Sequence, residues 1–137
     1  MIDDLVTANI GQGLLIFLGV EEADNLEDVA WLAGKISKLR IFSDVDGKMN
    51  ADIVNIDGRF LVVSQFTLHA NTRKGNRPSF IRAARPDVAI PLYEAFLLQL
   101  EKESGRAVRS GRFGADMKVS LLNDGPVTIW MDSKTRE

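Results

Sequence analysis

The stretch LLIFLGVEEADNLEDVAWLAGKISKL, residues 14–39, contains the first two elements of the expected fold. Its first seven residues form a continuous apolar run, which is typical of a strand buried on both faces. Asp24 and Glu27 have the spacing of a capping box, and apolar side chains then recur at helical spacing up to Leu39. The stretch therefore predicts a strand followed by a helix over about residues 25–39.

The segments that follow predict one mixed α/β domain. Residues 59–66 form a second apolar run that predicts a buried strand, and residues 118–122 and 127–131 predict two final strands. A second helix is expected over about residues 89–104, with its apolar face formed by Leu92, Ala95, Phe96 and Leu100. We therefore expect a single domain over residues 1–137, with a mixed sheet and two main helices.

Pro91 and several glycines bound these elements. Pro91 should lie near the first turn of the second helix, because deeper in the helix it would interrupt the hydrogen-bond ladder. The pairs Asp46-Gly47 and Asp57-Gly58 predict turns between the first helix and the second strand. Residues 69–78 read as a polar loop.

The composition excludes several classes of protein. The chain has 137 residues, one histidine and no cysteine, so a disulfide framework, a thiolate nucleophile and a cysteine metal site are all excluded. A net charge of -2 argues against a generic basic nucleic-acid binder, and no DNA partner is expected. The first nine residues do not resemble a signal peptide, and no apolar run could span a bilayer. We expect a cytoplasmic protein without a metal or other cofactor.

The charges are nevertheless clustered. Residues 69–86 contain five cations and no acid, whereas residues 21–28 contain five acids and no base. Either run can be an ordinary solvated surface. The basic run can alternatively contact phosphates at one edge of a mildly acidic protein, or its Lys74 and Arg77 can pair with the acidic run.

The sequence Ser64-Gln65-Phe66-Thr67-Leu68 lies where a predicted buried strand opens into a polar loop. Strand ends of this kind commonly bind ligands in α/β folds, and successive backbone N–H groups there could form an oxyanion hole. The alternative is that these polar side chains only terminate the strand. A nucleophilic Thr67 would need a nearby base. His69, the single histidine of the sequence, lies two residues away, but we expect it to be a surface loop residue.

The pair Gly125-Pro126 lies inside the sequence NDGPVT, residues 123–128. It can be a simple hairpin corner, because glycine tolerates positive φ and proline fixes its own φ. It can also be a cis peptide that points two neighbouring carbonyl groups in one direction, although cis bonds are uncommon before proline. The sequence leaves the isomer open.

Taken in order, several motifs resemble those of one family. They are residues 64–68 (SQFTL), 74–80 (KGNRPSF), 113–119 (FGADMKV) and 123–128 (NDGPVT), together with residues 10–15 and 31–42. The chain is similar to the D-aminoacyl-tRNA deacylases, once called D-tyrosyl-tRNA deacylases. The resemblance covers nearly the whole chain and implies the homodimeric α/β fold of that family.

The resemblance also implies a reaction and a site. The reaction is hydrolysis of the ester between a D-amino acid and the 3′-terminal adenosine of tRNA, with some action on glycyl-tRNA. Ser64, Gln65, Phe66 and Thr67 would bind the substrate, and the last three would form the catalytic site through their backbone N–H groups. Gly125 and Pro126 would be cis and would exclude L-amino acids from the partner subunit's pocket. Possible tRNA contacts are Arg73, Lys74 and Arg77.

Two roles for Thr67 are compatible with the resemblance. It could be a nucleophile, or the 2′-hydroxyl of the terminal ribose could activate water. The lack of a convincing base near Thr67 favours the second. The chain also departs from the family at its start, where the first strand that usually precedes residues 10–11 is expected to be missing. Two other functions stay open: removal of a small L-amino acid such as alanine from tRNA, and tRNA binding without catalysis.

Overall fold

A computed structural model of the chain describes residues 2 and 8–136. Within these residues the fold has two long helices, α1 and α2, together with five strands and one short 3-10 helix, η1. In chain order the elements are β1 (Gly13–Leu18), α1 (Leu26–Ser37), β2 (Phe42–Ser43), β3 (Met49–Ala51), β4 (Arg59–Ser64), η1 (Phe66–His69), α2 (Pro86–Ser104) and β5 (Val108–Ser110). The predicted α/β class with two main helices is confirmed.

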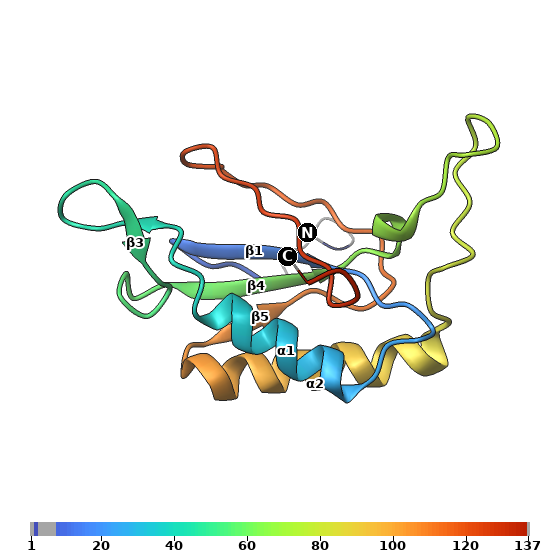
Figure 1. Ribbon diagram of the computed structural model, residues 1–137, viewed down its shortest axis with the longest axis horizontal. Coiled ribbons are helices and arrows are strands. Elements are labelled where there is room, and N and C mark those ends of the chain that lie inside the picture. Colours follow the sequence, from blue (N-terminus) through green and yellow to red (C-terminus); the bar gives the residue numbers. More distant parts are fainter. Residues whose placement is uncertain (1, 3–7, 137) are drawn as a thin grey trace.

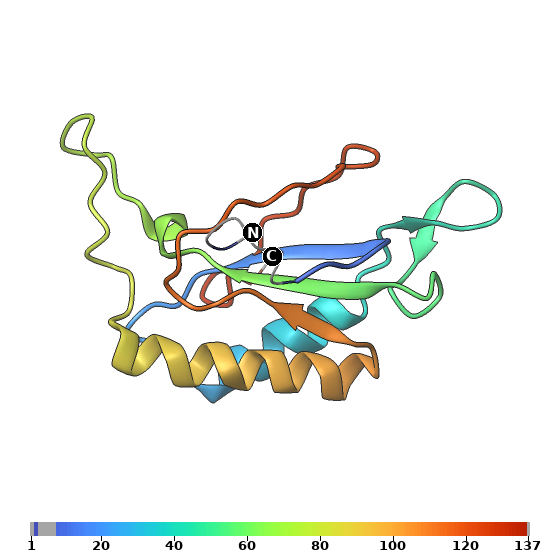
Figure 2. The same ribbon diagram turned by 180° about the vertical axis from the view of Figure 1, so that it is seen from behind.

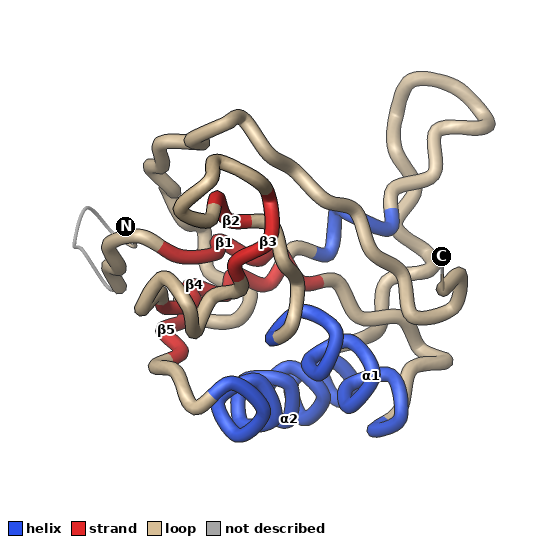
Figure 3. Tube along the Cα trace, turned by 60° about the vertical axis from the view of Figure 1, so that its left-hand side comes forward, coloured by secondary structure: helices blue, strands red, loops and turns tan. Residues whose placement is uncertain are grey.

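The central sheet has the strand order β1-β4-β5, and both strand pairs are parallel. The β1–β4 register runs from Gly13 opposite Arg59 to Leu18 opposite Ser64. Strands β2 and β3 form a separate antiparallel pair. Helices α1 and α2 lie together on one face of the central sheet, and the C-terminal segment crosses the other face (Figures 1 and 3). Parallel β1 and β4 require a crossover, which α1 supplies.

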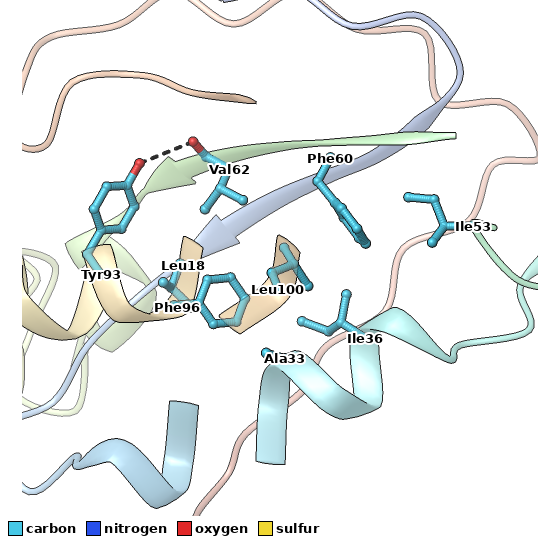
Figure 4. Close-up of a cluster of buried hydrophobic side chains, with 9 residues drawn as sticks. All are labelled: Leu18, Ala33, Ile36, Ile53, Phe60, Val62, Tyr93, Phe96 and Leu100. Atoms are coloured by element: carbon cyan, nitrogen blue, oxygen red, sulfur yellow. Dashed lines mark hydrogen bonds between the residues drawn. The ribbon is translucent and has the colours of Figure 1, made fainter. Parts of the chain in front are cut away.

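The core lies between the central sheet and the two helices (Figure 4). Phe60 and Val62 of β4 are fully buried there, because alternate side chains of a strand point to the same face. The Tyr93 hydroxyl of α2 donates a hydrogen bond of 3.3 Å to the Val62 carbonyl oxygen. The other members of this cluster are Leu18, Ala33, Ile36, Ile53, Phe96 and Leu100.

The strand predicted over residues 14–20 is confirmed as β1, but the expectation that both of its faces are buried is wrong for this single chain. Leu18 is buried, whereas the Phe17 side chain is 42% exposed. The helices cover only one face of β1, so a fully apolar run leaves its alternate side chains on the other face partly open to solvent.

The predicted helix over residues 25–39 is confirmed as α1, but its capping box lies one residue later than predicted. Asn25 is the N-cap and accepts hydrogen bonds from the backbone N–H groups of Glu27 and Asp28. The Asp28 carboxylate accepts from the Asn25 N–H at 2.9 Å. Asp24 instead accepts from the Glu21 N–H at 2.8 Å, which closes the turn before the helix.

Helix α2 begins earlier than predicted. Pro86 occupies its first turn and Arg85 is the N-cap, so Pro91 lies inside the helix rather than near its start. Pro91 is exposed, and the helix continues beyond it. The buried face consists of Ala89, Tyr93, Phe96 and Leu100, so the predicted Leu92 and Ala95 lie at its edges.

The strands predicted over residues 118–122 and 127–131 are wrong. These residues form an extended excursion to which no strand is assigned within the described part of the chain, and the preceding Met117 makes an isolated bridge to Ile2. The third strand of the central sheet is β5, which the sequence analysis did not predict. The segment 118–131 turns back on itself above the sheet, and the described residues form no ladder with it (Figure 2).

Candidate active site

The candidate site begins where β4 ends. The Gln65 N–H donates a 2.8 Å hydrogen bond to the Leu18 carbonyl oxygen, which extends the contact between β4 and β1 by one residue. The chain then turns into η1, which carries Phe66 and Thr67. The first N–H groups of a helix have no acceptor within it. The backbone N–H groups at the start of η1 therefore lie at the carboxyl end of a parallel strand.

The Thr67 hydroxyl does not face a base. Its oxygen accepts a hydrogen bond from the side-chain amide of Gln65. Thr67 and Phe66 are exposed, while Ser64 and Gln65 are half-buried. Within the described part of the chain, this arrangement offers backbone and amide donors to a ligand but no group that would deprotonate Thr67.

His69 is not the surface residue that the sequence predicted. Its side chain is only 16% exposed, and its Nδ1 lies 3.3 Å from Oε1 of Glu21. Its Nε2 is buried and has no hydrogen-bond partner in the described structure. In the described structure neither ring nitrogen makes a hydrogen bond to the Thr67 hydroxyl, so a Thr67–His69 pair is not formed.

Residues 71–79 form a projecting loop that we call the basic arm. Its two ends are joined by paired backbone hydrogen bonds between Asn71 and Ser79, of 2.7 and 2.8 Å. All of its residues are exposed, and the loop extends away from the body of the molecule beside η1 (Figure 1). The Phe66 and Phe80 rings meet edge to face at 5.0 Å, which joins η1 to the base of the arm. The cations of the arm are Arg73, Lys74 and Arg77.

These three cations do not pair with the acidic run of residues 21–28. Within residues 8–136, none of them makes an ion pair. The five acids pair instead with cations outside the arm: Glu21 with Arg82, Glu22 with Arg85, Glu27 with Arg136, and both Asp24 and Asp28 with Lys134. The arm is left as a positively charged, solvated projection, as a phosphate-contacting surface requires.

The Gly125–Pro126 peptide bond is cis, as the resemblance implies. Gly125 has φ 141°, and a Cβ there would lie 2.8 Å from Cγ2 of Val127, so only glycine fits without strain. The Asn123 side chain organises the corner: its oxygen accepts from the Val127 N–H at 2.9 Å, and its amide donates to the Thr128 hydroxyl at 3.2 Å. No sequence signal beyond the NDG turn had indicated this role of Asn123.

A single chain does not bring this corner to η1. The turn of the segment 118–131 and the helix η1 lie toward opposite ends of the molecule in both views (Figures 1 and 2). Residues 64–67 are therefore assembled locally, whereas Gly125 and Pro126 are exposed at a distance from them. Two hollows of about 190 and 400 Å³ lie around Trp31, and neither is lined by residues of these two motifs.

Neither a metal cluster nor a membrane helix is present in the described residues. No group of three or more His, Asp or Glu side chains there is close enough together to hold a metal ion. No helix formed by those residues combines the length and the apolar character needed to cross a bilayer.

Comparison with known proteins identifies the family. The D-Tyr-tRNA(Tyr) deacylase family matches residues 1–132 of the chain. The chain belongs to this family. Curated proteins called D-aminoacyl-tRNA deacylase are 62% identical in Flavobacterium johnsoniae, over 96% of this chain and 87% of the relative, and 66% identical in Akkermansia muciniphila, over 93% and 85%. These matches confirm the family that the motifs predicted. They also confirm the predicted enzyme class, a D-aminoacyl-tRNA deacylase.

Solved structures agree with the deacylase fold. A structure of a c-Myc DNA unwinding element binding protein superimposes with a TM-score of 0.86 at 36% identity, covering 94% of this chain and 87% of that chain. A probable eukaryotic D-amino acid tRNA deacylase has a TM-score of 0.66 at 18% identity, covering 83% and 82%, which supports the fold alone.

Proposed function

We propose that the protein hydrolyses the ester bond of D-aminoacyl-tRNA and releases the D-amino acid and free tRNA. The observation that carries this proposal is the family match over residues 1–132, combined with backbone donors at the end of β4. In this role the enzyme removes D-amino acids that were wrongly attached to tRNA, in the cytoplasm. Glycyl-tRNA is a further substrate, because glycine has no side chain to reject.

The reaction requires donors for the ester carbonyl and an activated water. The N–H groups of Phe66 and Thr67 are the proposed donors, and Gln65 fixes the Thr67 hydroxyl beside them. Donors aimed at a developing oxyanion stabilise the transition state without a side-chain nucleophile. Because the described structure offers Thr67 no base, we assign the activation of water to the 2′-hydroxyl of the terminal ribose.

Selection of the D enantiomer is proposed to work by exclusion at Gly125 and Pro126. Once the α-amino group and ester carbonyl are bound, a D-amino acid presents only hydrogen to the backbone carbonyl oxygens of this corner. An L-amino acid would drive its Cβ into them. Rejection by a clash needs no complementary side-chain pocket, so D side chains of many sizes are accepted.

This arrangement needs a second copy of the chain, and we propose a homodimer in which each corner completes the partner's site. The distance of the corner from η1 within one chain supports this (Figure 2). A second support is the apolar surface of the same segment, where large side chains are exposed: Leu121, Leu122, Ile129 and Trp130. Monomeric proteins seldom expose apolar side chains so close together.

The basic arm is proposed to contact the phosphates of the tRNA. Its cations are exposed and lie beside η1, so a bound 3′ end would bring the acceptor strand close to them. Phosphate contacts of this type add affinity without sequence specificity.

The test is ester hydrolysis with three substrates: D-Tyr-tRNA, L-Tyr-tRNA and L-Ala-tRNA. Release of D-tyrosine alone is the expected result. Release of L-alanine would instead indicate a deacylase for small L-amino acids, and tight tRNA binding without any release would indicate a non-catalytic homologue. D-Tyr-tRNA with a 2′-deoxy terminal adenosine should be hydrolysed far more slowly, and an unchanged rate would exclude the ribose hydroxyl from the mechanism.

A further inference from the structure

One carboxylate joins the candidate site to the basic arm. Oε1 of Glu21 lies 3.3 Å from Nδ1 of His69 and also accepts a hydrogen bond from the Arg82 guanidinium. His69 is the last residue of η1, and Arg82 follows the arm by three residues. A single oxygen atom therefore contacts both the last residue of η1 and a residue three positions beyond the basic arm.

The Glu21 side chain is itself held firmly. It is 16% exposed, and its backbone pairs with Ala83 in an antiparallel bridge. The neighbouring Val20 carbonyl accepts from the Ala84 N–H at 2.8 Å. Backbone hydrogen bonds thus join the segment after β1 to the segment after the basic arm. The Glu21 carboxylate extends from this junction toward His69 of η1.

His69 gives a second reason to regard this contact as more than packing. Its buried Nε2 has no hydrogen-bond partner among residues 2 and 8–136, which is an unfavourable environment for a polar atom. The ring lies against Gly19, where an added Cβ would approach Nε2 to 2.8 Å. An aliphatic side chain would fill this space without an unpaired nitrogen, so the useful atom of His69 is Nδ1, which faces Glu21.

We propose that Glu21 is a positioning residue, which holds η1 through His69 and the base of the basic arm through Arg82. The Phe66 and Thr67 donors and the phosphate-contacting cations are thereby kept in a fixed relation, so that an RNA bound by the arm delivers its ester to η1. This inference rests on the proposed deacylase function. Displacement of reacting groups by about 1 Å can lower a rate on the order of 100-fold.

The experiment measures kcat and KM separately with D-Tyr-tRNA. His69→Ala should lower kcat about tenfold or more, because η1 loses its tether. Arg82→Ala should chiefly raise KM, because the arm loses its fixed base. Glu21→Gln keeps the size of the side chain but removes the charge, so it should change both parameters. Adding His69→Ala to Glu21→Gln should not lower kcat further.

A matched control is available at the next residue. Glu22 lies one position along the chain and accepts from the Arg85 N–H at 2.9 Å, with the Arg85 guanidinium 3.9 Å away. Glu22→Gln removes the same charge from the same junction but touches neither η1 nor Arg82. It should leave kcat and KM close to those of the wild type.

Conservative replacement separates positioning from packing. His69→Asn retains an amide N–H near the place of Nδ1 and should restore most of the kcat that His69→Ala loses, whereas a space-filling role predicts no such recovery. If the wild type hydrolyses D-Tyr-tRNA but Glu21→Gln and Glu22→Gln have the same kcat and KM, this inference is overturned and the proposed function stays intact. An inactive wild type would overturn the proposed function itself. If Glu21→Gln does not fold, the inference is overturned when His69→Asn has a kcat as low as that of His69→Ala.

Discussion

The double variant Leu121→Asn, Leu122→Asn tests whether the segment that carries the Gly125–Pro126 corner forms a dimer interface. In the single chain these side chains are 60% and 91% exposed, so replacing them removes almost no packing within the monomer. Successive residues of an extended chain point to opposite sides. At least one of the two leucines should therefore face the partner, whichever side is covered.

The size of the effect follows from the exposed fractions. Complete burial of a leucine side chain contributes about 1.5–3 kcal/mol. Taking roughly 2 kcal/mol and the exposed fractions above, one leucine contributes about 1.2–1.8 kcal/mol to each protomer. A twofold interface contains it twice, which gives about 2.4–3.6 kcal/mol. At about 1.4 kcal/mol for each tenfold change, the dissociation constant of the dimer should rise about 50- to 400-fold.

Two measurements check this. Analytical ultracentrifugation over a range of protein concentration should give the shift in dissociation constant, and the deacylase activity per protomer should fall in parallel when the variant is diluted. Val45→Asn is the matched control, because Val45 is a fully exposed apolar residue in the turn between β2 and β3. A wild type that stays monomeric at all concentrations yet hydrolyses D-Tyr-tRNA would refute the reasoning.

Three further predictions concern the site, the arm and stability. Thr67→Ala should lower kcat by much less than the roughly 10²–10³-fold loss that follows removal of an oxyanion-hole donor, because the backbone N–H of residue 67 remains. Replacing the three cations of the basic arm with alanine should weaken tRNA binding in filter-binding assays. It should reduce the slope of log K against log salt by about 2–3. Asp28→Asn should lower the free energy of unfolding by about 1–2 kcal/mol at pH 7, measured with urea, because Lys134 Nζ donates to the carboxylate at 2.9 Å. Burial raises the pKa of Asp28, but the bonds from Lys134 and the Asn25 N–H outweigh it, so its pKa lies below the ordinary 3.8. A depressed pKa contributes stability that is fully present above pH 3.8, and the difference between the two proteins should shrink as the pH falls below that value.

Each of these predictions has a control or a contradicting result. A loss in kcat of about 10³-fold or more for Thr67→Ala would instead indicate side-chain catalysis. For the arm, alanine at the three cations near the end of α1, namely Lys35, Lys38 and Arg40, should leave the salt slope unchanged. For Asp28, an equal stability difference at pH 7 and pH 2.5 would show that the carboxylate charge is not responsible. Asp87→Asn, at an exposed position in the first turn of α2, is the matched substitution.

Strands β1 and β4 and helix α1 could be predicted because the sequence patterns that indicate them are local. A continuous apolar run predicts a strand, and apolar side chains at helical spacing predict α1, whatever the rest of the chain does. The error of one residue at the capping box has a local cause as well. Asp24 and Asn25 are both good N-caps, and the choice between them depends on the turn that Asp24 closes with Glu21.

Strand β5 and the C-terminal excursion were not predictable in this way. β5 has three residues, Val108–Ser110, too few for a periodic signal, and it is a strand because β4 offers it a parallel partner. Residues 118–122 and 127–131 have suitable composition for strands, but among residues 2 and 8–136 no strand is assigned to them. Strand formation depends on a partner, so composition alone overestimates it.

By itself, the sequence determined the α/β class, the two helices and the local motif at residues 64–67, because each depends on residues close together in the chain. It also determined the family, because the order of several short motifs along the chain can be read without the fold. Tertiary structure alone decided which charged groups meet. Glu21 reaches His69 and Arg82 across 48 and 61 positions, and these contacts exist only because β1 and β4 are parallel neighbours and the arm returns beside them. It also decided that the Gly125–Pro126 corner is directed away from η1, since the direction of an extended excursion is set by packing on the sheet rather than by its own residues.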